Sequence, residues 1–161
     1  MSRDVAVMSR SAGYLQNISI GQHRLQADEP VEAGGGDAGP NPYELLLAAL
    51  GACTSMTLRM YADRKRWPLE DIRVRLTHGK MHAEDCLGCE TKEGLVDQIE
   101  REILLVGNLR DEQRQRLLEI ANNCPVHRTL TSEIHIETRL TEAHKEVQFQ
   151  AGIPPSASTS Q

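Results

Sequence analysis

The stretch Leu45–Leu58, LLLAALGACTSMTL, carries no charged side chain and constrains the fold more than any other part of the sequence. Asn41, Pro42 and Glu44 before it suit the cap, the first position and the third position of a helix, which we expect to run to about Arg66. Apolar residues occupy most of the helix circumference, and such a helix has to be buried on all sides. Because the few short strands of one chain cannot cover it, the stretch predicts a second subunit.

Short alternating segments lie on both sides of this helix. Residues 14–29 contain two such runs about Gly21, which predicts a hairpin with a type II′ turn. Residues 71–78 and 98–106 alternate apolar with polar side chains, which is typical of half-buried strands. Glu133–Leu140 alternates in the same way and predicts the last strand.

A second helix is expected from about Asp111. It should end near Cys124, because Pro125 disfavours helical geometry at the residue before it. Strands, a long helix, strands, a helix and a strand, in this order, predict an α+β fold in which antiparallel sheet packs on helices. We expect a single domain over residues 1–146 and a disordered tail over residues 147–161.

Charge and aromatic content argue against a nucleic-acid partner. Lysine and arginine number 18 against 23 aspartates and glutamates, and there are only one tryptophan, three tyrosines and one phenylalanine to stack on bases. No stretch approaches the ~20 apolar residues that cross a bilayer, and the start of the chain lacks the apolar run of a signal peptide. We therefore expect a cytoplasmic protein with no membrane partner. Four cysteines in that reducing compartment suggest chemistry or metal more than structural disulfides.

Two of the cysteines are far apart in the sequence. Cys53 lies in the middle of the long helix, and Cys124 lies near the end of the second helix. Each can be a small buried apolar residue, which is the common state of a free cysteine. Alternatively they form a redox pair, in which a peroxidatic thiolate becomes a sulfenic acid and a second thiol condenses with it. Such a disulfide requires Cα atoms within about 7 Å.

The peroxidatic thiol has to ionise at neutral pH. Cys53 is too far from the start of its helix for the helix dipole to stabilise a thiolate. A cation has to do so, and arginine is the better candidate because it stays charged when it is desolvated.

Two blocks of the sequence, GPNPYELLLAALGAC (Gly39–Cys53) and NCPVHRTL (Asn123–Leu130), resemble the OsmC/Ohr family, and specifically its OsmC-like branch. These are the osmotically inducible and organic hydroperoxide resistance proteins, and the resemblance spans about His23–Leu140. It implies an intertwined α+β homodimer in which sheets from both chains wrap two long central helices. Members characterised as enzymes reduce organic and fatty-acid hydroperoxides with two cysteines and dithiol reductants such as lipoyl groups. We expect no cofactor.

The resemblance implies a role for three residues. Cys53 matches the peroxidatic cysteine, Cys124 the resolving cysteine, and Glu44 the glutamate that orients an activating arginine. Glu44 and Cys53 are nine positions apart, which is half a turn net and about 13.5 Å of rise, so they cannot meet on one helix. Glu44 would then serve Cys53 of the partner chain, unless its role is to cap its own helix.

The activating arginine departs from the family pattern. The loop before Glu44, PVEAGGGDAGPNP, contains none, and Arg24 is the nearest candidate. Arg24 can equally be a solvated strand arginine. Arg128, shortly after Cys124, is another possible cation.

Two functions are therefore open. The first is a thiol-dependent peroxidase for organic, lipid-like hydroperoxides, in which Leu46, Leu50 and Met56 form part of an apolar wall for the substrate. The alternative is a redox-sensing or small-molecule-binding protein on the same fold, in which Cys53 is a slow thiol because the arginine is missing.

The other two cysteines, Cys86 and Cys89, form a CxxC motif, with His82 and His78 four and eight residues before it. Tetrahedral zinc accepts two cysteines and two histidines. The motif lacks the usual separation between ligand pairs, however, and His78 falls on a predicted strand. A reversible disulfide and an inert pair in a loop are the alternatives, and we expect no metal.

Overall fold

The computed structural model describes residues 4–9 and 11–141, and the predicted tail over residues 147–161 lies outside them. The chain forms two compact units. Among the described residues, the terminal unit contains those up to Pro42 and residues 136–141, and the central unit is Tyr43–His135. The single domain over residues 1–146 stays a prediction.

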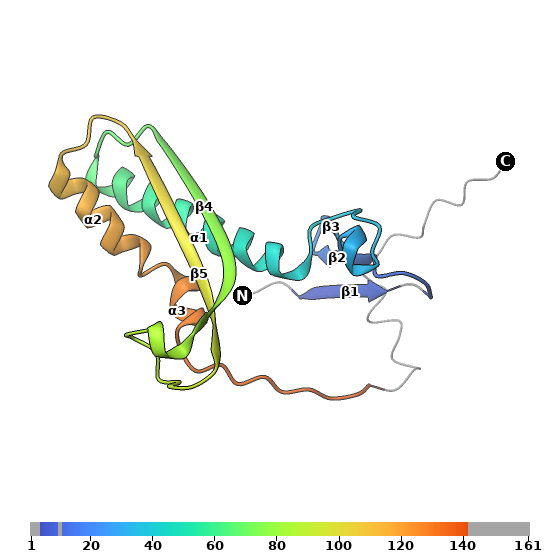
Figure 1. The fold of residues 1–161 in the computed structure, drawn as a ribbon. Helices are drawn as coiled ribbons and strands as arrows, with labels where there is room; N and C mark the ends of the chain where they lie inside the picture. Colours follow the sequence, from blue (N-terminus) through green and yellow to red (C-terminus); the bar gives the residue numbers. More distant parts are fainter. Residues whose placement is uncertain (1–3, 10, 142–161) are drawn as a thin grey trace. The chain divides into compact units, whose positions relative to one another are not determined.

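The terminal unit is built on a three-stranded antiparallel sheet (Figure 1). Its strands, in the order in which they pair, are β1 (Val5–Ser9), β2 (Gln16–Ile20) and β3 (His23–Ala27). β2 and β3 form the hairpin that the sequence predicts, and β1 was not expected. Gly21 has a φ of 57°, and Gln22 after it is not among the described residues with positive φ. A positive φ at the first central position alone agrees with the type II′ turn.

Asp28 organises the glycine-rich loop that follows β3. Its side chain is buried and accepts hydrogen bonds from the backbone N–H groups of Glu29, Gly36 and Ala38. The Ala38 bond lowers the pKa of Asp28 most; burial opposes this, and the bonds from Glu29 and Gly36 add to it. The Asp28 carboxylate therefore holds together the loop that leads into the long helix.

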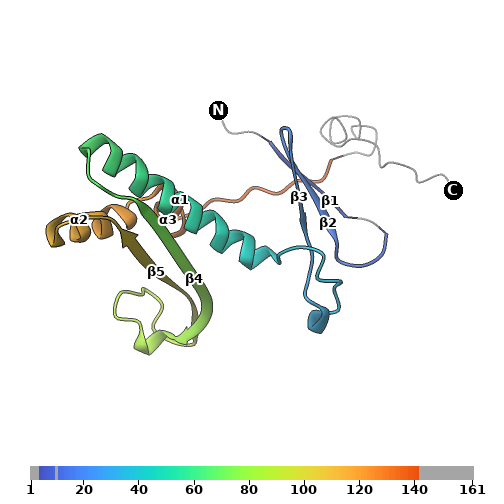
Figure 2. The same cartoon turned by 90° about the horizontal axis from the view of Figure 1, so that it is seen from above.

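The central unit combines a long hairpin with helices (Figure 1). Its elements are α1 (Pro42–Lys65), β4 (Asp71–His82), β5 (Leu95–Val106), α2 (Asp111–Ala121) and α3 (Pro125–Leu130), with a short 3-10 turn, η2 (Ala83–Asp85), between the two strands. β4 and β5 pair antiparallel, with Leu76 opposite Arg101. Figures 1 and 2 show this hairpin running alongside α1. The α+β class with antiparallel sheets is confirmed, whereas a single chain does not test the intertwined homodimer.

The core of the central unit lies between α1, α2 and the hairpin. Its buried side chains are Leu58, Ala62, Leu69, Leu109, Leu117 and Ala121. Ile72, Ile103 and Leu105 of the two strands pack against them. These inward strand residues alternate with outward ones, as the sequence predicts, although both strands extend several residues further towards their shared turn.

The prediction of a strand over Glu133–Leu140 is wrong for this chain. None of these residues is in a strand, and all are exposed, including Ile136 at 80%. Alternation indicates which face of a strand would be buried, but a strand forms only where a neighbour accepts its hydrogen bonds. In the part of the chain that the structure describes, no strand pairs with this segment.

α1 is not covered on all sides within one chain. Its buried residues form one stripe, namely Leu50, Thr54, Leu58 and Ala62. Met56 and Met60, on another face, are each 65% exposed. By length and composition α1 could also cross a membrane, which the sequence analysis did not expect. The core helix of a water-soluble protein passes the same test, and cover by a second subunit stays a prediction.

Candidate functional site

The two free cysteines meet at the start of α3. The backbone N–H of Val126 donates to Sγ of Cys53 over 3.5 Å, and that of His127 donates to Sγ of Cys124 over 3.4 Å. The two donors are consecutive in the sequence. Two sulfur atoms from residues that are 71 positions apart therefore lie at one turn of backbone.

Pro125 determines where that turn lies. Proline cannot continue a helix but suits the first position of a new one, so α2 ends at Ala121 and α3 begins at Pro125. The sequence predicts Cys124 at a helix end. The structure makes it the N-cap of α3 instead, with extended backbone and with its sulfur accepting from His127 N–H.

The two thiols differ in exposure. Cys124 is completely buried, whereas Cys53 is partly exposed. A molecule arriving from solvent therefore reaches the sulfur of Cys53 first.

Thr54, next to Cys53 on α1, links the two cysteines to a cation. Its buried hydroxyl donates to the carbonyl of Leu50 over 2.7 Å and accepts from Nη1 of Arg101 over 2.9 Å. The same hydroxyl lies 3.7 Å from Sγ of Cys124, where either atom can donate. One hydroxyl group thus contacts the guanidinium and one of the two thiols.

Arg101 is the functional candidate that the sequence analysis missed. Besides Thr54, its guanidinium donates to the carbonyl of Ala121 over 3.3 Å and to Oδ1 of Asn122 over 2.8 Å. It therefore ties β5 to α1 and to the end of α2. Its place in the strand could have revealed it from the sequence, because Arg101 falls on the same face of β5 as the inward-facing apolar residues. An arginine in such a position needs buried acceptors.

The environment shifts the acidity of two groups at this site. Burial raises the pKa of the Cys124 thiol, but the hydrogen bond from His127 N–H, the contacts with Thr54 and Cys53, and the charge of Arg101 together lower it by more. The net pKa is below the ordinary value, so the thiolate of Cys124 is favoured. The pKa of the His127 imidazole is lowered by burial and then by the charge of Arg101. Its ring is therefore neutral at pH 7.

A cavity of about 450 Å³ is lined by Arg101 and His127 of this site, whereas Cys53 and Cys124 are not part of its lining. Its lining includes Arg101 and His127 together with the apolar side chains of Leu50, Leu118 and Leu130. The arrangement suits a small molecule with an apolar body and a polar group directed at the guanidinium.

The substrate residues that the sequence suggests do not all meet in this cavity. Leu50 lines it, whereas Leu46 and Met56 are absent from its lining and are 37% and 65% exposed. An apolar wall that includes all three stays a prediction for the assembled dimer.

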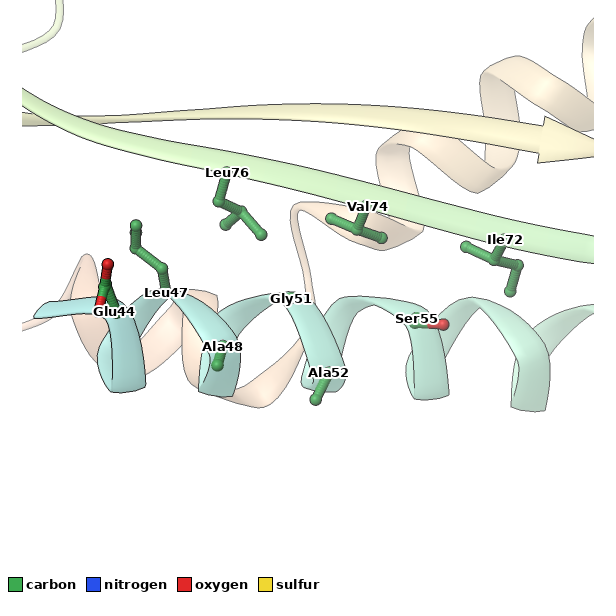
Figure 3. Close-up of a pocket in the computed structure, with 9 residues that line it drawn as sticks. All are labelled: Glu44, Leu47, Ala48, Gly51, Ala52, Ser55, Ile72, Val74 and Leu76. Atoms are coloured by element: carbon green, nitrogen blue, oxygen red, sulfur yellow. The ribbon is translucent and has the colours of Figure 1, made fainter. Parts of the chain in front are cut away.

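Glu44 lies on a different side of α1. It lines a groove of about 620 Å³ between α1 and β4, which Figure 3 shows with Ile72, Val74 and Leu76 directed from the strand towards the helix. Cys53 is not part of this lining. The positions of Glu44 and Cys53 agree with the half-turn offset expected from helix geometry. A role of Glu44 at the partner's Cys53 stays a prediction.

The sequence-based arginine candidates lie elsewhere. Arg24 is on β3 in the terminal unit, where its guanidinium donates to the carbonyls of Gly21 and His23. Its role at Cys53 stays a prediction. Arg128 is on α3 and is exposed.

The zinc candidates are His78, His82, Cys86 and Cys89. His78 hydrogen-bonds Asp97 through Nε2 over 2.9 Å and stacks on the ring of Tyr43. Cys86 and Cys89 are joined by a disulfide. Among residues 4–9 and 11–141, no group of three or more His, Cys, Asp or Glu side chains is placed to hold a metal ion.

Comparison with known proteins places this geometry in a family. The family model described as OsmC-like protein matches residues 34–139, which include both free cysteines and Arg101. No curated protein matches the chain significantly by sequence.

Several solved structures share the fold. An OsmC-like protein from Mycoplasma pneumoniae is 18% identical, with a TM-score of 0.64 over 82% of this chain and 89% of that one. An organic hydroperoxide resistance protein, OsmC, from Legionella pneumophila is 18% identical, with a TM-score of 0.61 over 82% and 90%. The organic hydroperoxide resistance protein OhrB of Bacillus subtilis is 20% identical, with a TM-score of 0.57 over 83% and 93%.

Identities this low carry the fold alone, but the family model covers most of the chain. The resemblance of the two sequence blocks is thereby confirmed, and the chain belongs to the OsmC-like protein family.

Proposed function

We propose that this protein is a thiol-dependent peroxidase that reduces organic, lipid-like hydroperoxides, with Cys53 as the peroxidatic and Cys124 as the resolving cysteine. The observation that supports this most is the shared turn, at which consecutive N–H groups of Val126 and His127 contact the two sulfurs. Neighbouring backbone groups therefore contact both sulfurs, which is the arrangement that a Cys53–Cys124 disulfide would need.

The proposed reduction of a hydroperoxide has three steps. The Cys53 thiolate attacks the outer peroxide oxygen, so that an S–O bond forms, the O–O bond breaks, and the alkoxide takes a proton to leave as the alcohol. Cys53 is then a sulfenic acid. The Cys124 thiolate attacks the sulfur of this sulfenic acid, so that the S–S bond forms, the S–O bond breaks, and the hydroxide takes a proton to leave as water. A dithiol of the lipoyl type reduces this disulfide by two exchange steps and becomes a cyclic disulfide itself.

The assignment of roles rests on exposure and acidity. Cys53 is the thiol that an incoming peroxide can reach, whereas Cys124 is buried. Burial raises the pKa of Cys124, but the hydrogen bond from His127 N–H, the contacts with Thr54 and Cys53, and the charge of Arg101 lower it by more. A lowered pKa suits a resolving thiol, because the thiolate is the form that attacks sulfur.

The substrate class rests on the cavity that Arg101 and His127 line. Its lining combines apolar side chains with these two residues and with the carboxylate of Asp97. A hydrophobic tail fits the apolar part, and the guanidinium can hydrogen-bond a peroxide or the oxygen that leaves from it. The two structural neighbours named organic hydroperoxide resistance proteins agree with this class of substrate.

We also propose that the active form is a cytoplasmic homodimer. A second copy would cover the exposed face of α1 that carries Met56 and Met60. In this assembly Glu44 of one chain would orient an arginine, with Arg24 as the candidate, at Cys53 of the partner.

The direct test is consumption of cumene hydroperoxide by the purified full chain with dihydrolipoamide as reductant. We expect sustained turnover by the wild type and none by Cys53→Ser. The matched control replaces the other cysteine pair, Cys86→Ser with Cys89→Ser, and should keep the wild-type rate. Equal rates for wild type and Cys53→Ser would exclude the peroxidase. A single stoichiometric oxidation without turnover would favour the redox-sensing alternative.

A further inference from the structure

The peroxide chemistry uses two of the four cysteines. The other two, Cys86 and Cys89, lie in the turn between β4 and β5, directly after η2. They are joined by a disulfide with a Cα–Cα distance of 5.4 Å.

This turn is closed by hydrogen bonds that do not involve the sulfurs. Ala83 N–H donates to the carbonyl of Gly94 over 2.8 Å, and Cys86 N–H donates to that of Ala83 over 3.1 Å. The Cys89 carbonyl accepts from Nζ of Lys92 over 2.7 Å. A disulfide across two intervening residues closes a very short loop and therefore constrains the unfolded chain least. Opening this disulfide leaves the turn its backbone bonds and costs the fold little.

The disulfide is also accessible. Both cysteines are partly exposed, and the two residues between them, Leu87 and Gly88, are exposed, Leu87 completely. Exchange requires a thiolate to approach one sulfur along the S–S axis, so access governs its rate. An exposed disulfide that adds little to stability is suited to reversible chemistry.

We propose that Cys86 and Cys89 form a second redox site, a reversible disulfide that exchanges with small uncharged dithiols. A thiolate of the dithiol attacks one protein sulfur, breaks the Cys86–Cys89 bond and forms a mixed disulfide. The second thiol of the dithiol then attacks this bond, closes its own ring and releases the remaining cysteine. Two electrons and two protons pass from the dithiol to the protein pair, and a small disulfide reverses the reaction.

The charges of the turn select the partner. Four exposed acidic residues flank the cysteines, namely Glu84, Asp85, Glu90 and Glu93. Lys92 is the single lysine or arginine between Ala83 and Gly94. The field of the turn is therefore negative and repels every attacking thiolate, but it repels a dithiol that carries a further negative group more strongly than one that carries none.

This site is separate from the peroxide site. Arg101 is six positions along β5 from Leu95, where the strand begins, which is about 20 Å at the usual rise per strand residue. The proposed exchange at the turn uses only Cys86, Cys89 and the dithiol, and it needs neither Cys53 nor Cys124. The proposal consequently does not depend on whether the protein reduces peroxides.

The test uses the wild-type full chain under native conditions. Dihydrolipoamide is added, free thiols are trapped by alkylation, and peptide masses assign each label. We expect Cys86 and Cys89 to become labelled within minutes and to be protected again after hydroxyethyl disulfide is added, with unchanged far-UV circular dichroism. The Cys86→Ser, Cys89→Ser variant controls for labelling of other residues. Reduction only in denaturant, loss of structure on reduction, or zinc bound by the pair in the purified protein would each overturn the proposal.

A second experiment tests whether the charge of the turn discriminates between dithiols. Dihydrolipoate carries the same dithiol as dihydrolipoamide but adds a carboxylate. We expect the amide to open the disulfide about threefold faster at low salt, with the difference vanishing at high salt because charges on an exposed turn are screened. Equal rates at low salt would overturn the selection for an uncharged dithiol.

Discussion

Arg101 donates a hydrogen bond of 2.9 Å to the hydroxyl of Thr54, and this contact joins the middle of β5 to the residue beside Cys53. The same hydroxyl contacts the sulfur of Cys124. Guanidinium stays charged when it is partly desolvated. Arg101 thus supplies a positive charge at the cysteine pair, although the family resemblance read from the sequence did not include it.

Replacement of Arg101 should slow the resolving step. Burial raises the pKa of Cys124, and the His127 N–H bond, the contacts with Thr54 and Cys53 and, last, the charge of Arg101 lower it. Arg101→Met should therefore raise that pKa and move the pH midpoint of Cys53–Cys124 disulfide formation upwards. Arg101→Lys keeps a charge and should move the midpoint less. Quenched-flow mass analysis after a single addition of peroxide measures this rate. A midpoint that is the same in all three proteins would contradict the role of Arg101.

The same substitution should reduce stability. Arg101→Met removes charge-assisted hydrogen bonds to Thr54 and Asn122, and we expect a loss of about 1.5–3 kcal/mol in the free energy of unfolding. Urea denaturation measures it, and Arg73→Met, an exposed arginine on β4, is the control.

Removal of the resolving thiol should leave the first oxidation intact. Cys124→Ser keeps Cys53 and its contact with Val126 N–H, so Cys53 still reacts with peroxide once. Because no second thiol can condense with the sulfenic acid, we expect it to oxidise further to sulfinic and sulfonic acid. Intact mass spectrometry against increasing peroxide reports this. Sulfenic acid that persists, or a disulfide to another cysteine, would contradict the pairing.

Acid should destabilise the protein through His127. Burial and the charge of Arg101 lower its folded-state pKa below the ordinary 6.5. The unfolded chain therefore takes up the proton first, and stability that is present above pH 6.5 is lost as the pH falls towards the folded-state value. His127→Gln removes this titration, so its free energy of unfolding should depend less on pH between 7 and 5. Parallel pH dependences in wild type and variant would refute the assignment.

Dimer formation should depend on the exposed face of α1. Met56 is 65% exposed in the single chain, and Met56→Glu would bury a charge in the proposed interface, which costs several kcal/mol without a partner. We expect a monomer by light scattering at micromolar concentration. Gln115→Glu, an exposed position on α2, adds the same charge and should remain dimeric. Wild type that is monomeric throughout would remove the dimer from the proposal.

Much of the fold follows from local signals. α1 starts at Pro42 and ends within one residue of the expected boundary, because capping residues, a long uncharged stretch and the approach to Pro68 all act locally. The β2–β3 hairpin and the inward faces of β4 and β5 follow from turn residues and alternation for the same reason. Pro125 likewise marks a helix boundary, although the six-residue α3 after it is too short to be recognised by periodicity.

The cysteine site was also only partly predictable from the sequence. Cys53 and Cys124 could be selected from the sequence, because their blocks resemble a family that uses two such thiols. Arg101 could not, because its acceptors at Thr54, Ala121 and Asn122 come from elements brought together only by packing.

The sequence by itself determined α1, the β2–β3 hairpin, the inward faces of β4 and β5 and the α+β class, and it selected Cys53 and Cys124 as the candidate pair. Tertiary structure alone decided that both sulfurs lie at one turn beside Arg101, and that Glu133–Leu140 forms no strand within one chain. The physical reason is that helix ends, turns and alternation depend on near neighbours along the chain. Strand pairing and the partners of a buried charge depend on residues that are distant in sequence and adjacent only after folding.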